Sequence, residues 1–397
     1  MIEIGNPRIS SVGDRTRLAA EVVVDGVSHE LWFEVEEKYG KYLCAERSDA
    51  FVLAMLQYAF RHGHDIKSEA PMTDRLYEQL TDQFLPAFTK INFLNTTISA
   101  PTAPEVEHPE GGCRTGSGLS CGVDSLHVYA RHPEVDMACV WSTGVVAEGG
   151  AAADEVAVQV AAIQKRAEAF AEHVRLPLLK GWTNFDRAFM SGVQWDGMTT
   201  NGNLFCIFAI QKLWKRYYVA SDCDIENFHF KVGSISGDPA RYEYFLFPFV
   251  CLNRIQARMD GAAHNRVEKV RDLLKYEPAK RYLNVCWRTN ENHRNGTNDC
   301  PKCMRTLLDL DAFGAVDDFK DVFDVEYFHK YQHEFLAEYY RGVIQNDNFA
   351  LELVPYFKGR YFPLMMKIKA WKIVFKKAVK KALRRGKTKH GGFSSKG

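Results

Sequence analysis

The chain has 397 residues, of which 46% are hydrophobic and 25% charged, and its formal net charge is +1. This composition is ordinary for a globular protein and leaves room for two or three domains. No apolar stretch approaches the roughly 20 residues that cross a bilayer, and the first residues lack a secretory signal, which excludes membrane-spanning and secreted classes. We therefore expect a cytoplasmic protein whose ten cysteines are reduced.

Residues 1–105 predict a small α+β domain whose role the sequence does not reveal. A hairpin is expected over residues 15–37, around the turn signal Asp25-Gly26. Helices should follow over residues 49–61 and 72–90, and Pro86 should kink or end the second of them. A linker rich in proline and glycine then leads to the next domain.

Residues 106–312 alternate between strand and helix patterns. Strands are expected near residues 135–141, 176–179 and 217–220, with helices over 155–174, 204–213 and 262–274, while the apolar run 245–252 fits neither period. This alternation predicts a doubly wound α/β domain with a mostly parallel sheet. The segment 111–119 has few apolar residues for a buried first strand. Either that strand is short, or residues 96–99 belong to the sheet in its place.

A Gly-rich stretch inside this domain ends in Ser120-Cys121-Gly122-Val123-Asp124-Ser125 and runs into a helix-like segment. Small residues at a helix start leave backbone N–H groups unpaired at the positive end of the helix dipole, and this is a phosphate cradle. The hydroxyls of Ser120 and Ser125 add donors. Asp124 would repel phosphates unless a bound Mg²⁺ bridged the two. The alternative is a Ser- and Gly-rich turn that caps an ordinary helix.

This hexamer resembles the Ser-Gly-Gly-x-Asp-Ser signature of the PP-loop ATP pyrophosphatases, with Cys121 in place of a glycine. The resemblance implies an adenine nucleotide alpha hydrolase-like fold that binds ATP and Mg²⁺ on residues 120–125. It also implies catalytic roles for Ser120, Asp124 and Ser125. Cys121 would have to adopt a loop backbone that suits glycine, and its thiol would lie near the nucleotide.

A second motif combines Cys286 with the pair Cys300 and Cys303. A C-x₂-C pair with a distant third cysteine is a partial zinc site, because Zn²⁺ takes thiolate ligands from tight turns. His293 is the fourth ligand that we expect. Asp299 could serve instead, or the three thiols could lie in a surface turn without metal.

The order of the two motifs is similar to that in 7-cyano-7-deazaguanine synthase and its relatives, PP-loop enzymes with a four-cysteine zinc site. The resemblance covers roughly residues 110–312, and Thr297 stands where that group has its fourth cysteine. It implies an ATP-dependent ligase that adenylates a carboxylate or similar oxygen for nitrogen transfer. Two other functions stay open: tRNA thiolation or amide transfer to a sugar or amino acid, and a non-catalytic nucleotide-binding module.

Residues 313–397 predict a C-terminal helical region with a basic tail. Aromatic residues over 313–357 suit helices packed on a core, and no acidic residue follows Glu352. In the tail, Trp371, Val374 and Phe375 share one helical face whose other sides are filled with Lys and Arg. Such a helix suits an anionic membrane surface, RNA or an acidic partner, so a peripheral membrane location is also open. A docked terminal helix with a solvated basic face is the alternative.

Overall fold

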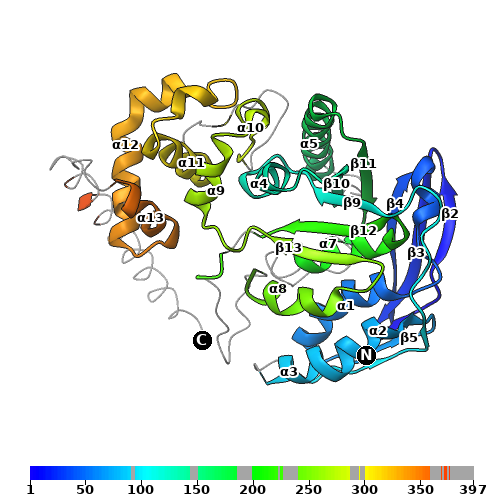
Figure 1. Ribbon diagram of the computed structural model, residues 1–397. Helices are drawn as coiled ribbons and strands as arrows, with labels where there is room; N and C mark the ends of the chain where they lie inside the picture. The colour runs from blue at the N-terminus through cyan, green and yellow to red at the C-terminus, as the bar shows by residue number, and fades with distance from the viewer. Residues whose placement is uncertain are drawn as a thin grey trace, which may run out of the picture. The chain divides into compact units, whose positions relative to one another are not determined.

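The computed structural model describes residues 1–90, 94–143, 151–185, 199–221, 224–226, 240–286, 295, 300–357, 368, 371–372 and 375. The chain forms two compact units (Figure 1). The first comprises Met1–Asn265 with Thr289–Asn292, and the second comprises Arg266–Arg288 and His293–Gly397. The boundaries expected at residues 105 and 312 do not coincide with this division, because the N-terminal strands share a sheet with the strands that follow.

The first unit is mixed α/β and is built on a large, mostly parallel sheet, as the alternating pattern predicted. Its described strands form one sheet of eleven, in the order β13-β12-β9-β10-β11-β4-β3-β1-β5-β7, with β2 beside β3. These strands are β1 Ile2–Ile4, β2 Arg8–Val12, β3 Arg15–Val24, β4 Val27–Glu36, β5 Ile66–Ser68, β7 Ile98–Ser99, β9 Arg114–Gly118, β10 Met137–Thr143, β11 Leu178–Thr183, β12 Trp214–Ala220 and β13 Gln256–Asp260. A separate pair joins β6 (Met72–Thr73) to β8 (Thr102–Ala103).

The five strands from β9 to β13 pair in parallel, and β9 lies between β10 and β12. The chain passes from β9 through α4 (Val123–Arg131) to β10 and through α5 (Ala151–Val174) to β11. It then returns through α7 (Thr199–Ala209) to β12, on the other side of β9. The strand order therefore reverses at β9.

Helices lie on both faces of this parallel region (Figure 1). Helix α4 packs on β9 and β12, and α5 packs on β10 and β11. On the opposite face α7 packs against α1 (Asp49–His62), and both helices share one apolar core with inward side chains of the sheet. Helices therefore cover both faces of the central strands, as in other parallel sheets.

Strand β9 is short and made of small residues, which resolves the doubt over the first strand of this region. A Cβ added to Gly116 would lie 2.5 Å from the Trp214 ring of β12, so the absence of a side chain lets that indole cover the strand. Residues 98–99 do join the same sheet, but as β7 at its far edge. Packing against a neighbour's large side chain therefore substitutes for apolar residues in β9.

The hairpin predicted over residues 15–37 is confirmed as β3 and β4. Its turn residues Asp25 and Gly26 have φ angles of 50° and 82°, the left-handed conformations that a tight hairpin turn needs. Strand β4 also pairs antiparallel with β11. This pairing places the N-terminal strands in the same sheet as the parallel region.

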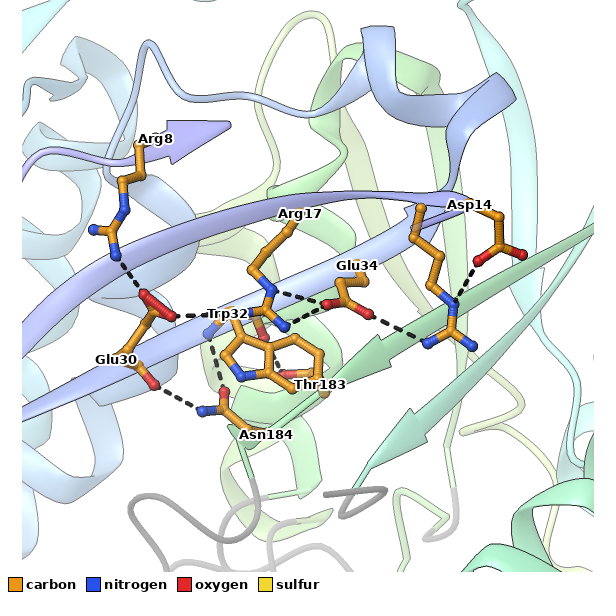
Figure 2. A network of polar contacts seen from close by, with 9 residues as sticks. Arg8, Asp14, Arg17, Glu30, Trp32, Glu34, Thr183 and Asn184 are labelled. Atoms are coloured by element: carbon orange, nitrogen blue, oxygen red, sulfur yellow. Dashed lines mark hydrogen bonds and ion pairs between the residues drawn. The ribbon is translucent and has the colours of Figure 1, made fainter. Parts of the chain in front are cut away.

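Side chains reinforce the junction between β4 and β11 (Figure 2). Thr183 donates a 2.7 Å hydrogen bond to the Trp32 carbonyl, and Asn184 accepts one of 3.0 Å from the Trp32 N–H. The buried carboxylate of Glu34 also pairs with Arg15 (3.3 Å) and Arg17 (2.6 Å), which joins β4 to β3 on its other side. Residues 1–105 are therefore fixed to the later strands through backbone and side chains.

The first predicted helix is confirmed as α1, which ends at Gly63 with a φ of 63°. The second, expected over residues 72–90, is broken into three parts. Helix α2 (Asp74–Glu78) is followed by a π-helical stretch, Gln79–Phe84, and then by α3 (Leu85–Thr89) with Pro86 in its first turn. Pro86 lacks an N–H, and the first turn of a new helix is the position where that loss is tolerated.

Later elements follow the sequence pattern with shifted ends, apart from two. The apolar run 245–252 forms the end of α8 (Ala240–Leu246) and a 3₁₀ turn, Phe247–Val250. Strand β13 (Gln256–Asp260) was not predicted, because its residues Gln, Ala, Arg, Met and Asp lack β-branched or aromatic side chains. It forms because β12 offers it a parallel backbone edge.

The second unit is helical in its described residues. It contains α9 Arg266–Leu273, α10 Glu277–Tyr282, α11 Pro301–Ala312, α12 Val325–Ile344 and α13 Asn348–Leu353. Aromatic residues of α12 pack inward, including Phe328 and Phe335, as expected for this segment. In the basic tail, Trp371 and Phe375 are 58% and 71% exposed. No helix in the described part of the chain has both the length and the apolarity to cross a bilayer.

Candidate functional site

The Ser120–Ser125 segment lies at the point where the strand order reverses. It follows the central strand β9, and α4 begins at Val123 with Gly122 as its N-cap. The N-cap makes no side-chain hydrogen bond to the first turn. Since the first N–H groups of a helix have no intrahelical partner, the start of α4 can donate to an anion.

Hydroxyl groups within the loop bond to one another and fix its shape. The Gly122 N–H donates to Ser120 Oγ at 3.2 Å, and the two serine Oγ atoms of Ser120 and Ser125 lie 3.1 Å apart. Ser125 Oγ in turn donates to the Gly122 carbonyl at 3.2 Å. These bonds keep both hydroxyls beside the helix start.

The loop is open to solvent on one side. Ser120 is exposed, and Gly122 and Asp124 are half-buried. Ser125 is only 6% exposed, beneath them. Accordingly, Ser120 and the backbone of Gly122 are accessible to a ligand, whereas Ser125 supports the loop from below.

Cys121 adopts the left-handed backbone that glycine would favour, with a φ of 57°. Its side chain is 1% exposed. Burial raises the pKa of the Cys121 thiol to about 12, against an opposing effect of the Arg166 guanidinium on α5. This side chain turns into the interior and stays protonated at neutral pH. The electrostatic effect of Arg166 also puts a cation near the loop, which no local motif indicated.

Other strands of the parallel region end at the same edge of the sheet as β9. β10 ends at Thr143, β12 at Ala220 and β13 at Asp260. Ser142 is buried and accepts a 2.9 Å hydrogen bond from Gln164 of α5, while the Ser221 N–H donates to the Asp260 carbonyl at 2.8 Å. Gly144 and Asp222, which follow these two strands closely, lie outside the described residues.

Three cysteines meet in the second unit, as their spacing predicted. The Sγ atoms of Cys286, Cys300 and Cys303 lie within 4.8 Å of one another, and all three side chains are buried. Cys300 is the N-cap of α11, Pro301 begins the helix and Cys303 lies in its first turn. The positive end of the helix dipole therefore favours the thiolate form that binds metal.

The side chain of Asn295 fixes the backbone at Cys286, and the sequence motifs did not indicate this residue. Its side chain is 3% exposed and accepts hydrogen bonds from the N–H groups of Val285 (3.0 Å) and Cys286 (3.1 Å). It donates to the carbonyls of Leu283 (2.7 Å) and Val322 (3.0 Å). A single buried amide thus positions the backbone of Cys286. In the sequence, no local pattern distinguishes Asn295 from the other polar residues between Cys286 and Cys300.

The cysteine group can bind a metal ion such as zinc. Tetrahedral Zn²⁺ with Zn–S bonds of about 2.3 Å separates its sulfur ligands by roughly 3.8 Å, which these three atoms reach with small rotations. Soft thiolates also match zinc among the common metals. Both candidates for the fourth ligand, His293 and Asp299, lie outside the described residues.

Comparisons with protein-family models, with curated proteins and with solved structures find no match for this chain. Its function is therefore inferred from the chemistry of its own residues: a loop rich in Ser and Gly at the carboxyl edge of a parallel sheet, and a buried group of three thiols.

Proposed function

We propose that the chain is an ATP-dependent adenylating enzyme of the PP-loop class, which converts ATP to AMP and pyrophosphate. The observation that carries the proposal is the position of Ser120–Ser125, between the central strand β9 and the start of α4. In open α/β sheets, ligands bind where the strand order reverses, at the carboxyl ends of the strands. A PP-loop signature at that position favours an ATP site over an ordinary helix cap.

The loop would hold the pyrophosphate part of ATP. Backbone N–H groups at the start of α4 and the accessible hydroxyl of Ser120 would donate to phosphate oxygens, and Ser125 would support Ser120. Asp124, half-buried in the first turn of α4, is the residue that would hold Mg²⁺. When bound, this ion would neutralise charge on the departing pyrophosphate.

The reaction would begin with attack of a substrate oxygen, such as a carboxylate, on the α-phosphorus. The bond to the bridging oxygen would break, pyrophosphate would leave, and the substrate would carry AMP as an acyl adenylate. Ammonia would then displace AMP and give an amide, the nitrogen transfer typical of deazaguanine-synthase-like enzymes. The protein would contribute position and electrostatic stabilisation, so no protein nucleophile is required. The buried, protonated Cys121 agrees with this, because it offers no thiolate.

Zinc would have a structural role in this enzyme. Cys286, Cys300 and Cys303 would supply three ligands, and His293 would be the fourth. All three thiols are buried. A closed site of this kind stabilises a turn and leaves no open position for a substrate.

An RNA acceptor, as in tRNA thiolation, is the second candidate. The observation that favours it is the exposure of Trp371 and Phe375 within a Lys-rich segment. Aromatic side chains stack on unpaired bases, and lysines neutralise phosphates. Deletion of residues 366–397 should then abolish RNA binding in a filter assay. Loss of binding to anionic liposomes, with RNA binding unchanged, would instead indicate a membrane surface.

The test of the main proposal is release of AMP and pyrophosphate from ATP with Mg²⁺, ammonium and a panel of carboxylate acceptors. The double substitution Ser120→Ala and Asp124→Asn should abolish both products, while circular dichroism shows an unchanged fold. Ser11→Ala, at an exposed position of β2, is the matched control and should keep full activity. Activity that survives the double substitution would exclude this loop as the ATP site.

A further inference from the structure

The second unit contains a cavity that the proposed ATP chemistry does not use. It has a volume of about 440 Å³ and is lined by residues of α11, α12 and α13 and the turn between α12 and α13. This volume is within the range of pockets that bind small molecules. Leu308, Tyr339, Phe349 and Leu353 supply its apolar lining.

A buried carboxylate lines this cavity. Asp309 of α11 is 2% exposed, and within the described part of the chain its Oδ2 atom has no hydrogen-bond partner. Burial raises the pKa of Asp309 to about 7, opposed by Arg266 and Arg305 and assisted by Glu352. A buried acceptor without a partner is unfavourable, and a donor or cation delivered by a ligand would remove that penalty.

The guanidinium of Arg305, on the same helix, can also bind a charged group of a ligand. Arg305 lies one helical turn before Asp309, and both line the cavity. Charges at this spacing commonly pair along a helix, yet no ion pair joins these two within the described residues. Arg305 lies over the Phe349 ring, 3.8 Å from its centroid, and its Nε donates a weak 3.4 Å hydrogen bond to the Pro301 carbonyl. Its terminal nitrogens keep capacity for an anionic partner.

The other charged side chains of the lining make contacts within the protein. Arg341 donates to Glu338 at 2.5 Å and also bonds to Gln345. Asp347 accepts a 3.1 Å hydrogen bond from the Ala350 N–H and so caps α13. Among the charged groups of the lining, Arg341 and Glu338 form an ion pair, and Asp347 caps a helix. Asp309 and Arg305 have neither kind of contact within the described residues, although each is influenced by charges nearby.

From these two charged groups without an ion pair, in a cavity of mixed polarity, we propose that the second unit binds a small amino-acid-like zwitterion. The ammonium group of the ligand pairs with Asp309, and its carboxylate pairs with Arg305. The side chain of the ligand lies against the apolar lining, where Phe349 and Tyr339 favour a large hydrophobic or aromatic group. One ligand then satisfies both charges at once.

The experiment compares three probes by calorimetry on the full-length protein. L-phenylalanine carries both charges, phenethylamine lacks the carboxylate and 3-phenylpropionate lacks the amine. L-phenylalanine should bind to one site per chain, and either truncated probe should bind about tenfold or more weakly, because each leaves one buried charge unpaired. Equal affinity of L-phenylalanine and one truncated probe would overturn the proposal.

Two substitutions assign the contacts. Asp309→Asn keeps the shape of the side chain and should weaken L-phenylalanine and phenethylamine but not 3-phenylpropionate. Arg305→Met keeps the apolar stem and should weaken L-phenylalanine and 3-phenylpropionate but not phenethylamine. Asp318→Asn, at an exposed position, is the control and should change nothing.

Fold and metal content are measured for each variant by circular dichroism and by mass spectrometry of zinc, since Cys303 lies on the same helix. If L-phenylalanine, L-leucine, L-methionine and L-arginine all fail to bind the wild-type protein at about 10 mM, the proposal is wrong. At that concentration even a millimolar site gives a measurable stabilisation.

Discussion

The proposed phosphate loop, Ser120–Ser125, and the cysteine group both lie at the start of a helix, but they would use the helix dipole in different ways. At α4 Ser120 is exposed before the helix, and negative charge beyond that of Asp124 would come from a bound ligand. At α11 the side chains of Cys300 and Cys303 are buried, and as thiolates they would bring the negative charge themselves. The first arrangement suits a substrate that comes and goes, and the second suits a resident metal.

The largest expected effect concerns the cysteine group. Cys300→Ser should reduce bound zinc from about one ion per chain to nearly none and strongly lower the melting temperature of the second unit. In small zinc peptides metal binding contributes about 10–16 kcal/mol to folding, so even a fraction of this is a large loss. Mass spectrometry and calorimetry measure the two quantities.

Cys113→Ser is the control for that substitution, because Cys113 is an exposed cysteine outside the group. Zinc content and melting temperature should both stay unchanged in this variant. A wild-type protein that binds no zinc after expression in zinc-supplemented medium would contradict the assignment of the site.

The next effect tests how the metal site is held. Asn295→Ala removes the amide that bonds Cys286, Val285, Leu283 and Val322, and it should lower the free energy of unfolding by about 2–5 kcal/mol. Zinc affinity should fall by about 10- to 100-fold, as for other groups that orient metal ligands. Competition with a chelator measures the affinity. An unchanged affinity would mean that Asn295 stabilises the turn without positioning Cys286.

A smaller loss of stability is expected from a substitution in β9, the strand that leads to the proposed phosphate loop. Gly116→Ala would put a Cβ 2.5 Å from the Trp214 ring and should cost about 1–3 kcal/mol of stability. Gly118→Ala is a matched control on the same strand, because its Cβ would meet its nearest neighbour, the Tyr217 hydroxyl, at 3.6 Å. Urea denaturation of both variants should therefore separate them. Equal losses would show that Trp214 does not set the requirement for glycine in β9.

The smallest effect concerns Cys121. Cys121→Gly relieves a left-handed backbone that costs about 1–2 kcal/mol in other residues, but it also removes a buried side chain, so stability should change by less than about 1 kcal/mol.

The rate of alkylation measures how accessible and how reactive the Cys121 thiol is in the wild-type protein. Because the pKa of the Cys121 thiol is raised to about 12, it stays protonated and resists iodoacetamide at pH 8, whereas the exposed Cys113 reacts. Peptide mapping distinguishes them. Rapid labelling of Cys121 in the folded protein would show that the loop opens.

Features formed by residues close together in the chain could be predicted from the sequence. The phosphate loop is six consecutive residues, so its composition and its helix could be identified directly. The α/β alternation was equally visible, because the apolar stripes of α5 and α7 are local. The cysteine spacing indicated the metal group for the same reason.

Features that depend on partners far along the chain could not be predicted. Asn295 bonds to Leu283 and Val322, which lie on either side of it in the chain, and no local pattern marks it for this role. Strand β13 forms through its pairing with β12, and β9 is stabilised by Trp214 on a neighbouring strand. Likewise, the spacing of Arg305 and Asp309 is typical of a solvent-exposed ion pair, and only the cavity gives it another meaning.

Calorimetric titration with α,β-methylene-ATP, an analogue that cannot be cleaved between the α- and β-phosphates, tests the proposed ATP site without turnover. We expect one site per chain that requires Mg²⁺, with affinity reduced at least tenfold by Ser120→Ala and Asp124→Asn together. Absence of binding in the wild-type protein, or equal binding by the double variant, would contradict it.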